Sequence, residues 1–125
     1  MTLIDNYRRG WALRYLREAK AELTAAQKIP YMASSRLLEA SRKAQAAVYY
    51  SLGDPGSIEA IVHQVVLQRQ SVEEPVLRCL VEIERAVQQV AQMSNSDREA
   101  AMKQAGDIVQ LASDIVELFT GERGD

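Results

Sequence analysis

The stretch YMASSRLLEASRKAQAAVYYSL, residues 31–52, decides the fold of this chain. Its apolar residues recur at steps of three and four positions, which is the period of an amphipathic helix. Two neighbouring stripes result, the first of Ala33, Leu37, Ala40, Ala44 and Ala47 and the second of Leu38, Ser41, Gln45, Val48 and Leu52. Because two adjacent stripes of mostly small residues let several neighbours pack closely, we expect this segment to be the central helix of a bundle.

Four further segments around this helix carry the same periodicity. Apolar positions predict helices over about residues 5–28, 57–70, 71–93 and 96–120. Only a few Pro, Gly or Ser positions separate consecutive segments, so neighbouring helices are expected to be antiparallel. No segment alternates with period two, and we predict no strand. The sequence therefore predicts an all-α fold, an antiparallel up-down helical bundle of about five helices that forms one domain over residues 1–125.

Local signals predict where three of these helices begin. The segment 71–74, SVEE, is a capping box and is expected to start the fourth helix, with Pro75 in the first turn. The segment 96–99, SDRE, is a second capping box and is expected to start the fifth helix. The third helix has two candidate N-caps, Asp54 and Ser57.

The composition is that of a globular chain. Of the 125 residues, 47% are hydrophobic and 26% charged, which is enough apolar side chain for one core. Cys79 is the single cysteine, which excludes an intramolecular disulfide and a cysteine-based zinc site. No secretory signal follows Met1, and no stretch reaches the roughly 18 uncharged apolar residues of a membrane span. We therefore expect a cytoplasmic protein without membrane contact.

His63 is the only histidine of the sequence. Glu59 precedes it by one helical turn, so the pair forms a candidate polar site, as a general base or a weak metal ligand. A partly buried histidine on a helix surface explains the same residues. One histidine cannot supply the two Glu-x-x-His motifs of a di-iron site. The sequence also contains neither a nucleophile elbow nor a phosphate-binding glycine loop. The sequence predicts no catalytic residue, no cofactor and no metal.

Positive charge is concentrated in the first part of the chain. Residues 1–56 carry nine Lys or Arg against five Asp or Glu, whereas residues 57–125 carry six against twelve. Candidate phosphate or RNA contacts lie on the first two helices at Arg14, Arg17, Arg42 and Lys43. Tyr49 and Tyr50 follow, and basic residues beside aromatics are suited to phosphates and bases. A solvated face, or pairing of the basic helices with the acidic ones, accounts for the same pattern.

Three segments resemble the HEPN family of small helical bundles, named for nucleotide binding in higher eukaryotes and prokaryotes. They are residues 11–23 (WALRYLREAKAEL), 38–47 (LEASRKAQAA) and 105–109 (AGDIV). The resemblance implies a bundle of four or five helices that dimerises through helices. It also implies a ribonuclease, a toxin, or a non-catalytic partner of a nucleotidyltransferase.

Catalytic HEPN members carry an arginine followed, after four to six residues, by a histidine. The corresponding positions before His63 are Gly56, Ser57 and Ile58, so the catalytic arginine is missing and no catalytic role is carried over. We therefore expect a non-catalytic helical interaction or ligand-binding module, an inactive member of that family, that acts as a homodimer. The alternative is an RNA-directed ribonuclease or toxin–antitoxin component that uses the basic first hairpin.

Overall fold

A computed structural model describes residues 5–93 and 95–122, and in that part of the chain it contains helices and no strand. The elements are α1 (Asn6–Lys28), the 3₁₀ helix η1 (Pro30–Met32), α2 (Ala33–Leu52), α3 (Pro55–Gln68), α4 (Pro75–Met93) and α5 (Arg98–Thr120). The prediction of an all-α helical bundle is confirmed. None of the helices in the described ranges is both long enough and apolar enough to cross a bilayer.

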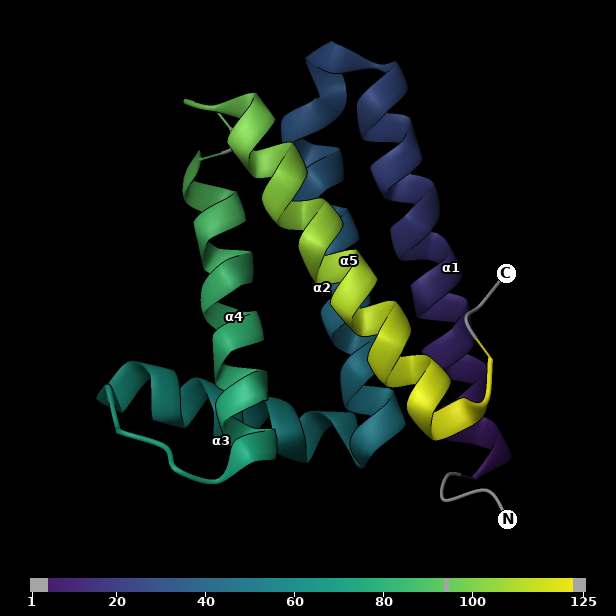
Figure 1. Ribbon diagram of the computed structural model, residues 1–125, viewed down its shortest axis with the longest axis vertical. Helices are drawn as coiled ribbons and strands as arrows, with labels where there is room; N and C mark the ends of the chain where they lie inside the picture. Colours follow the sequence, from purple (N-terminus) through teal and green to yellow (C-terminus); the bar gives the residue numbers. More distant parts are fainter. Residues whose placement is uncertain (1–4, 94, 123–125) are drawn as a thin grey trace.

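Four of the helices run along the long axis of the molecule and alternate in direction (Figure 1). These are α1, α2, α4 and α5, and each is antiparallel to the next of the four along the chain. The shorter α3 lies across the end of the bundle where α2 ends and α4 begins (Figure 1). The central helix is α2, because it contacts α1, α3, α4 and α5.

The core around α2 is built from small aliphatic side chains. All five residues of its first predicted stripe are fully buried, and Ser41, Gln45 and Val48 of the second stripe are buried too. The two buried serines of α2 bond to their own helix, since Ser41 Oγ donates to the Leu37 carbonyl and Ser51 Oγ to the Ala47 carbonyl, each at 2.9 Å. Alanines let helices approach closely, so a larger side chain on this stripe is expected to cost about 1–3 kcal/mol through overpacking.

On α5, Val109 and Val116 belong to the core of this chain. The bundle itself therefore covers these two valines. Leu118 is different, because 79% of its surface is exposed.

Two predicted helix starts are wrong. The fourth helix begins at Pro75 rather than at Ser71. Proline suits the first helical position, because the backbone N–H that it lacks would have no hydrogen-bond partner within the helix there. The preceding Glu74 then caps the helix, and its carboxylate accepts from the backbone N–H of Val76 at 3.1 Å and of Leu77 at 2.6 Å.

The fifth helix is capped by Asp97, whose Oδ1 accepts from the Ala100 N–H at 3.1 Å. Ser96 instead bonds back to the Met93 carbonyl, with its N–H at 3.1 Å, and so closes the end of α4. At α3 the first of the two candidates is the cap, since Asp54 Oδ2 accepts from the Ser57 N–H at 3.0 Å.

Candidate functional site

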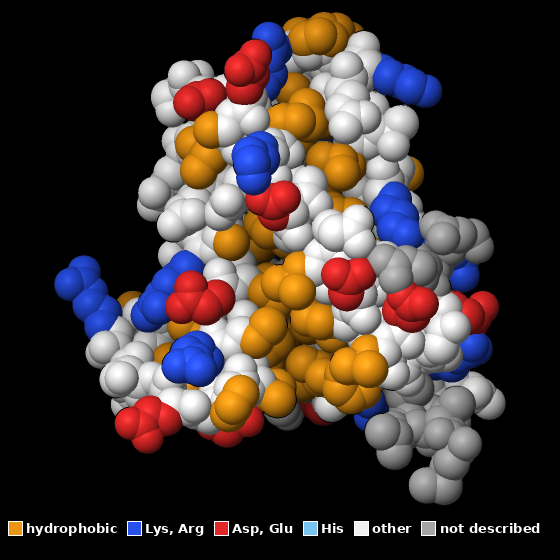
Figure 2. All heavy atoms as spheres, in the orientation of Figure 1, with side chains coloured by type: hydrophobic (Ala, Val, Ile, Leu, Met, Phe, Trp, Pro, Cys, Tyr) orange, Lys and Arg blue, Asp and Glu red, His pale blue; other side chains and the backbone are white. Residues whose placement is uncertain are grey.

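An apolar groove runs between α4 and α5. Two pockets of about 280 and 260 Å³ make it up, and they adjoin at Cys79, which lines both of them. Figure 2 shows hydrophobic side chains gathered in the lower central part of the face that presents these helices. We call this feature the α4–α5 groove.

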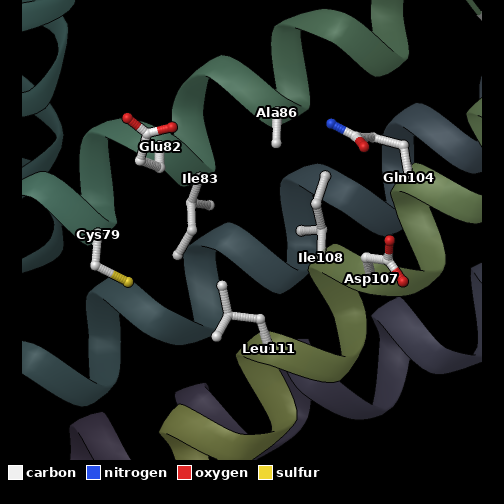
Figure 3. Close-up of a pocket in the computed structure, with 8 residues that line it drawn as sticks. All are labelled: Cys79, Glu82, Ile83, Ala86, Gln104, Asp107, Ile108 and Leu111. Carbon is white, nitrogen blue, oxygen red and sulfur yellow. The ribbon is translucent and has the colours of Figure 1, made fainter.

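The upper part of the groove is shown in Figure 3. Ile83 of α4 and Leu111 of α5 point toward each other across the gap, Ile108 of α5 extends toward Ala86 of α4, and the Cys79 sulfur is directed into the gap. Polar side chains from both helices line the same pocket, including Glu82 and Asp107 (Figure 3).

Apolar residues follow heptad spacing along both sides of the groove. The positions are Val76, Cys79, Ile83 and Ala86 on α4, and Ile108, Leu111, Ile115 and Leu118 on α5. Steps of three and four residues are those of a and d positions in a coiled coil. Val76, Leu111 and Leu118 remain exposed, so each stripe has an edge that no described residue covers.

Charges beside the groove are paired within each helix. Arg85 lies 3.4 Å from the Glu82 carboxylate on α4, and Lys103 lies 3.1 Å from the Asp107 carboxylate on α5. Such exposed pairs contribute little to stability. Each pair is neutral as a pair.

The Cys79 thiol is half-buried where the two pockets meet. Burial, and to a smaller extent the nearby Glu82 carboxylate, raise its pKa above the ordinary value. Because the thiolate is the reactive form, this cysteine is expected to be a slow nucleophile at neutral pH.

A second feature is a buried polar network where α2, α3 and α4 meet. Glu84 of α4 is only 2% exposed, and its Oε1 accepts from Arg42 Nη1 at 3.0 Å and from Gln45 Nε2 at 2.6 Å. Its Oε2 accepts from Gln88 Nε2 at 2.8 Å. We call these residues, together with Tyr49, the Glu84 network.

Burial alone would raise the pKa of Glu84, but the hydrogen bonds from Gln45 and Gln88 and the charge of Arg42 outweigh it. The pKa of this carboxyl is therefore lowered, and Glu84 is ionised at neutral pH. Tyr49 shows the opposite behaviour. Its buried hydroxyl accepts from Gln45 Nε2 at 3.0 Å, and burial together with the Glu84 charge raises its pKa.

The structure places His63 beside this network rather than in an isolated pair with Glu59. His63 Nε2 lies 3.8 Å from Glu84 Oε1 and 4.0 Å from Glu59 Oε1. About half of the imidazole is exposed, which agrees with a histidine on a helix surface. Within residues 5–93 and 95–122, no three His, Cys, Asp or Glu side chains are grouped so that they could hold a metal ion.

The four predicted basic contacts do not form one surface. Arg42 faces α4, whereas the neighbouring Lys43 faces α1, where it lies 3.2 Å from the Glu18 carboxylate and 3.5 Å from that of Glu22. Consecutive residues on a helix are about 100° apart, so Arg42 and Lys43 cannot serve the same face.

On α1, Arg14 and Arg17 lie on the exposed side of the helix. Arg14 Nε donates to Glu18 at 3.0 Å. The hydrogen bonds from Arg14 and Lys43 lower the pKa of the Glu18 carboxyl. Two of the predicted cations therefore share one acidic partner on the first hairpin.

Four aromatic rings cluster on the α1–α2 hairpin. The Trp11 ring lies 5.7 Å from Tyr15 and 6.2 Å from Tyr50, and Tyr7 meets Trp11 edge-on at 6.4 Å between centroids. The Arg14 guanidinium lies 4.9 Å from the Trp11 centroid, within cation–π range. Outside this cluster the core is aliphatic apart from Tyr49.

No protein-family model, curated protein or solved structure matches this chain. The candidate sites therefore rest on the chain's own geometry.

Proposed function

We propose that this protein is a non-catalytic helical interaction module that acts as a homodimer through the α4–α5 groove. The observation that carries the proposal is the pair of heptad stripes that line the groove, with Val76, Leu111 and Leu118 exposed on them. A HEPN-like relationship is part of the same proposal, because that resemblance implies dimerisation through helices and the catalytic arginine is absent.

A second copy is the occupant that the geometry of the groove favours. The antiparallel pair of α4 and α5 presents two heptad stripes side by side, which is half of a four-helix bundle. A two-fold axis would set the same half against it and bury both sets of stripes. Fully burying one Leu or Val side chain contributes roughly 1.5–3 kcal/mol, so a few such residues per copy support association.

The charges beside the groove are compatible with self-association. The pairs Arg85–Glu82 and Lys103–Asp107 cancel within each helix, so these four charges add no net repulsion between two identical rims. A strongly acidic or strongly basic partner would gain little electrostatic attraction from these paired charges. A further protein partner, such as a nucleotidyltransferase, would use the surface that remains outside the groove.

The experiment is the solution mass of the full chain, measured by light scattering during gel filtration. We expect a mass near twice the 14.0 kDa of one chain at concentrations of tens of micromolar. The variant Leu118→Asp should shift the mass toward that of one chain. Leu67→Asp is the matched control, because Leu67 is 84% exposed on α3 and lies outside the groove. A monomeric wild-type chain would exclude the homodimer.

The aromatic cluster favours a second candidate function, the binding of single-stranded RNA by the first hairpin. Tyr7 is exposed and the other three rings are partly exposed, and rings of this kind near Arg14 and Arg17 are suited to base stacking with phosphate contacts. Trp11 is the only tryptophan, so its fluorescence reports on this face directly. A titration with a short single-stranded RNA should quench that fluorescence in a salt-dependent way, and an unchanged signal at low salt would remove this candidate.

A further inference from the structure

A pocket lies against the Glu84 network, on the side of α4 away from the groove. Its volume is about 370 Å³, and Arg42, His63, Glu84 and Gln88 line it together with the apolar Val66 and Leu67. A smaller pocket of about 200 Å³ adjoins it on the other side of Arg42. Arg42 is the residue that lines both pockets.

Only one edge of the Arg42 guanidinium is used inside the protein. Nη1 donates to Gln45 Oε1 and to Glu84 Oε1, each at 3.0 Å. No residue in the described ranges accepts from Nε or Nη2, and 44% of the side chain is exposed. Nε and Nη2 lie on the same side of the planar group and form the fork that binds a carboxylate or a phosphate through two parallel hydrogen bonds.

The buried network holds this fork in place. Glu84 and Gln45 are buried, and both accept from the same Arg42 nitrogen, which fixes the plane of the guanidinium. Gln88 holds the second oxygen of Glu84. A guanidinium oriented from behind by a carboxylate loses little conformational freedom on binding an anion, which is how supporting residues make a site effective.

The remaining lining residues indicate which other chemical groups a ligand of this pocket would carry beside its anionic group. His63 has an exposed imidazole at the pocket and supplies a further N–H donor. Val66 and the exposed Leu67 supply an apolar wall from α3. The charges of Glu84 and Glu59 oppose an anion, so binding depends on the fork rather than on net positive charge.

We propose that this pocket binds a small organic oxyanion, a carboxylate or phosphate group held by the Arg42 fork and His63, with an apolar part against Val66 and Leu67. The proposal does not rest on the homodimer, because α2, α3 and α4 of one chain form the pocket.

The test is a titration of the isotope-labelled full chain with three probes, followed by backbone amide NMR shifts. Hexanoate combines a carboxylate with an apolar tail, inorganic phosphate has no tail, and hexylamine has the same tail with the opposite charge. We expect saturable shifts at Arg42, His63, Leu67 and Gln88 with hexanoate or with phosphate. Tighter binding of hexanoate would indicate an organic acid, and tighter binding of phosphate would indicate a phosphorylated compound.

Variants distinguish a loss of anion binding at the Arg42 fork from a general loss of protein stability. Arg42→Lys keeps a cation beside Glu84 but removes the fork, and it should weaken binding of either anion roughly tenfold. Arg78→Lys, at an exposed arginine of α4 that does not line the pocket, is the matched control and should leave binding unchanged. Leu67→Ser should weaken hexanoate binding and not phosphate binding. If Arg42→Lys fails to fold, the exposed His63→Gln variant tests the same site, with a smaller loss expected.

Two outcomes would overturn the proposal. One is the absence of saturable shifts at these four residues with both anions. The other is saturable binding of hexylamine at the pocket without binding of hexanoate, because this would mean that Glu84 and Glu59, rather than Arg42, select the ligand.

Discussion

Glu84 Oε1 accepts a hydrogen bond from Arg42 Nη1 at 3.0 Å and so joins the middle of α4 to the middle of α2. The two residues differ in exposure, since the carboxylate is buried whereas the guanidinium reaches the surface. A buried charge is expensive unless it is fully paired, and here three donors satisfy it. This contact therefore makes position 84 sensitive to the loss of its carboxylate.

Replacing Glu84 by alanine should lower the free energy of unfolding by about 2–4 kcal/mol, because it leaves a cavity and strands buried donors such as Gln45. The matched control is Glu82→Ala, an exposed glutamate on the same helix, which should change stability by less than about 0.5 kcal/mol. Urea unfolding followed by circular dichroism measures both values. Equal effects of the two variants would contradict the stabilising role of the network.

The contribution of the Glu84 charge to stability should depend on pH. Its pKa is lowered on folding from the ordinary value of 4.5, so ionisation favours the folded state above that value. This contribution is present at neutral pH and is lost as the pH falls below about 4.5 and through the lower pKa of the folded state. The difference in unfolding free energy between wild type and Glu84→Gln should therefore shrink between pH 7 and pH 3. A difference that is constant over this range would contradict the lowered pKa.

Cys79 should react slowly with a maleimide at neutral pH, because burial and Glu82 raise its pKa. The rate should increase as the pH rises above neutral, and Glu82→Gln should accelerate it modestly. If two copies associate through the α4–α5 groove, the rate should also fall as the protein concentration rises. A rate equal to that of an unstructured cysteine peptide would show that the thiol is not shielded.

Glycines inside and at the end of helices should respond in opposite directions to alanine. Gly10 in α1 and Gly106 in α5 have open space where a Cβ would lie, so alanine there should raise stability by about 0.5–1 kcal/mol. Gly121 follows α5 with φ at +80°, a left-handed conformation in which alanine is strained and should cost about 1 kcal/mol. Thermal unfolding of the three variants measures these effects, and a stabilising Gly121→Ala change would contradict the cap assignment.

The helices were predictable because their signals are local. The period of α2 in residues 31–52 and the breaks around it depend on the chain alone, and they predicted the bundle and its central helix. The errors at the starts of α4 and α5 are also local. Ser71 and Ser96 each satisfy the capping-box pattern, but Glu74 next to Pro75, and Asp97, make the caps instead.

The candidate sites were only partly predictable. Arg42 and His63 were named from the sequence, but as members of two unrelated sets, and nothing along the chain indicates that they line one pocket. Glu84 was missed, although a signal exists. It lies four residues after Leu80 and three before Val87, on the apolar face of α4, where a carboxylate needs buried partners.

The sequence by itself determined the helical class, the number of helices and the identity of the central helix. The signals for these features are the 3.6-residue period of apolar side chains and the Pro and Gly breaks, and each can be recognised within a short segment of the chain. Only the tertiary structure decided which side chains share a site. The crosswise placement of α3 brings His63 to Glu84, and the packing of α4 beside α5 leaves Leu118 uncovered. These relationships depend on how helices pack against one another, and helix packing is set by the shapes of whole faces rather than by any one segment.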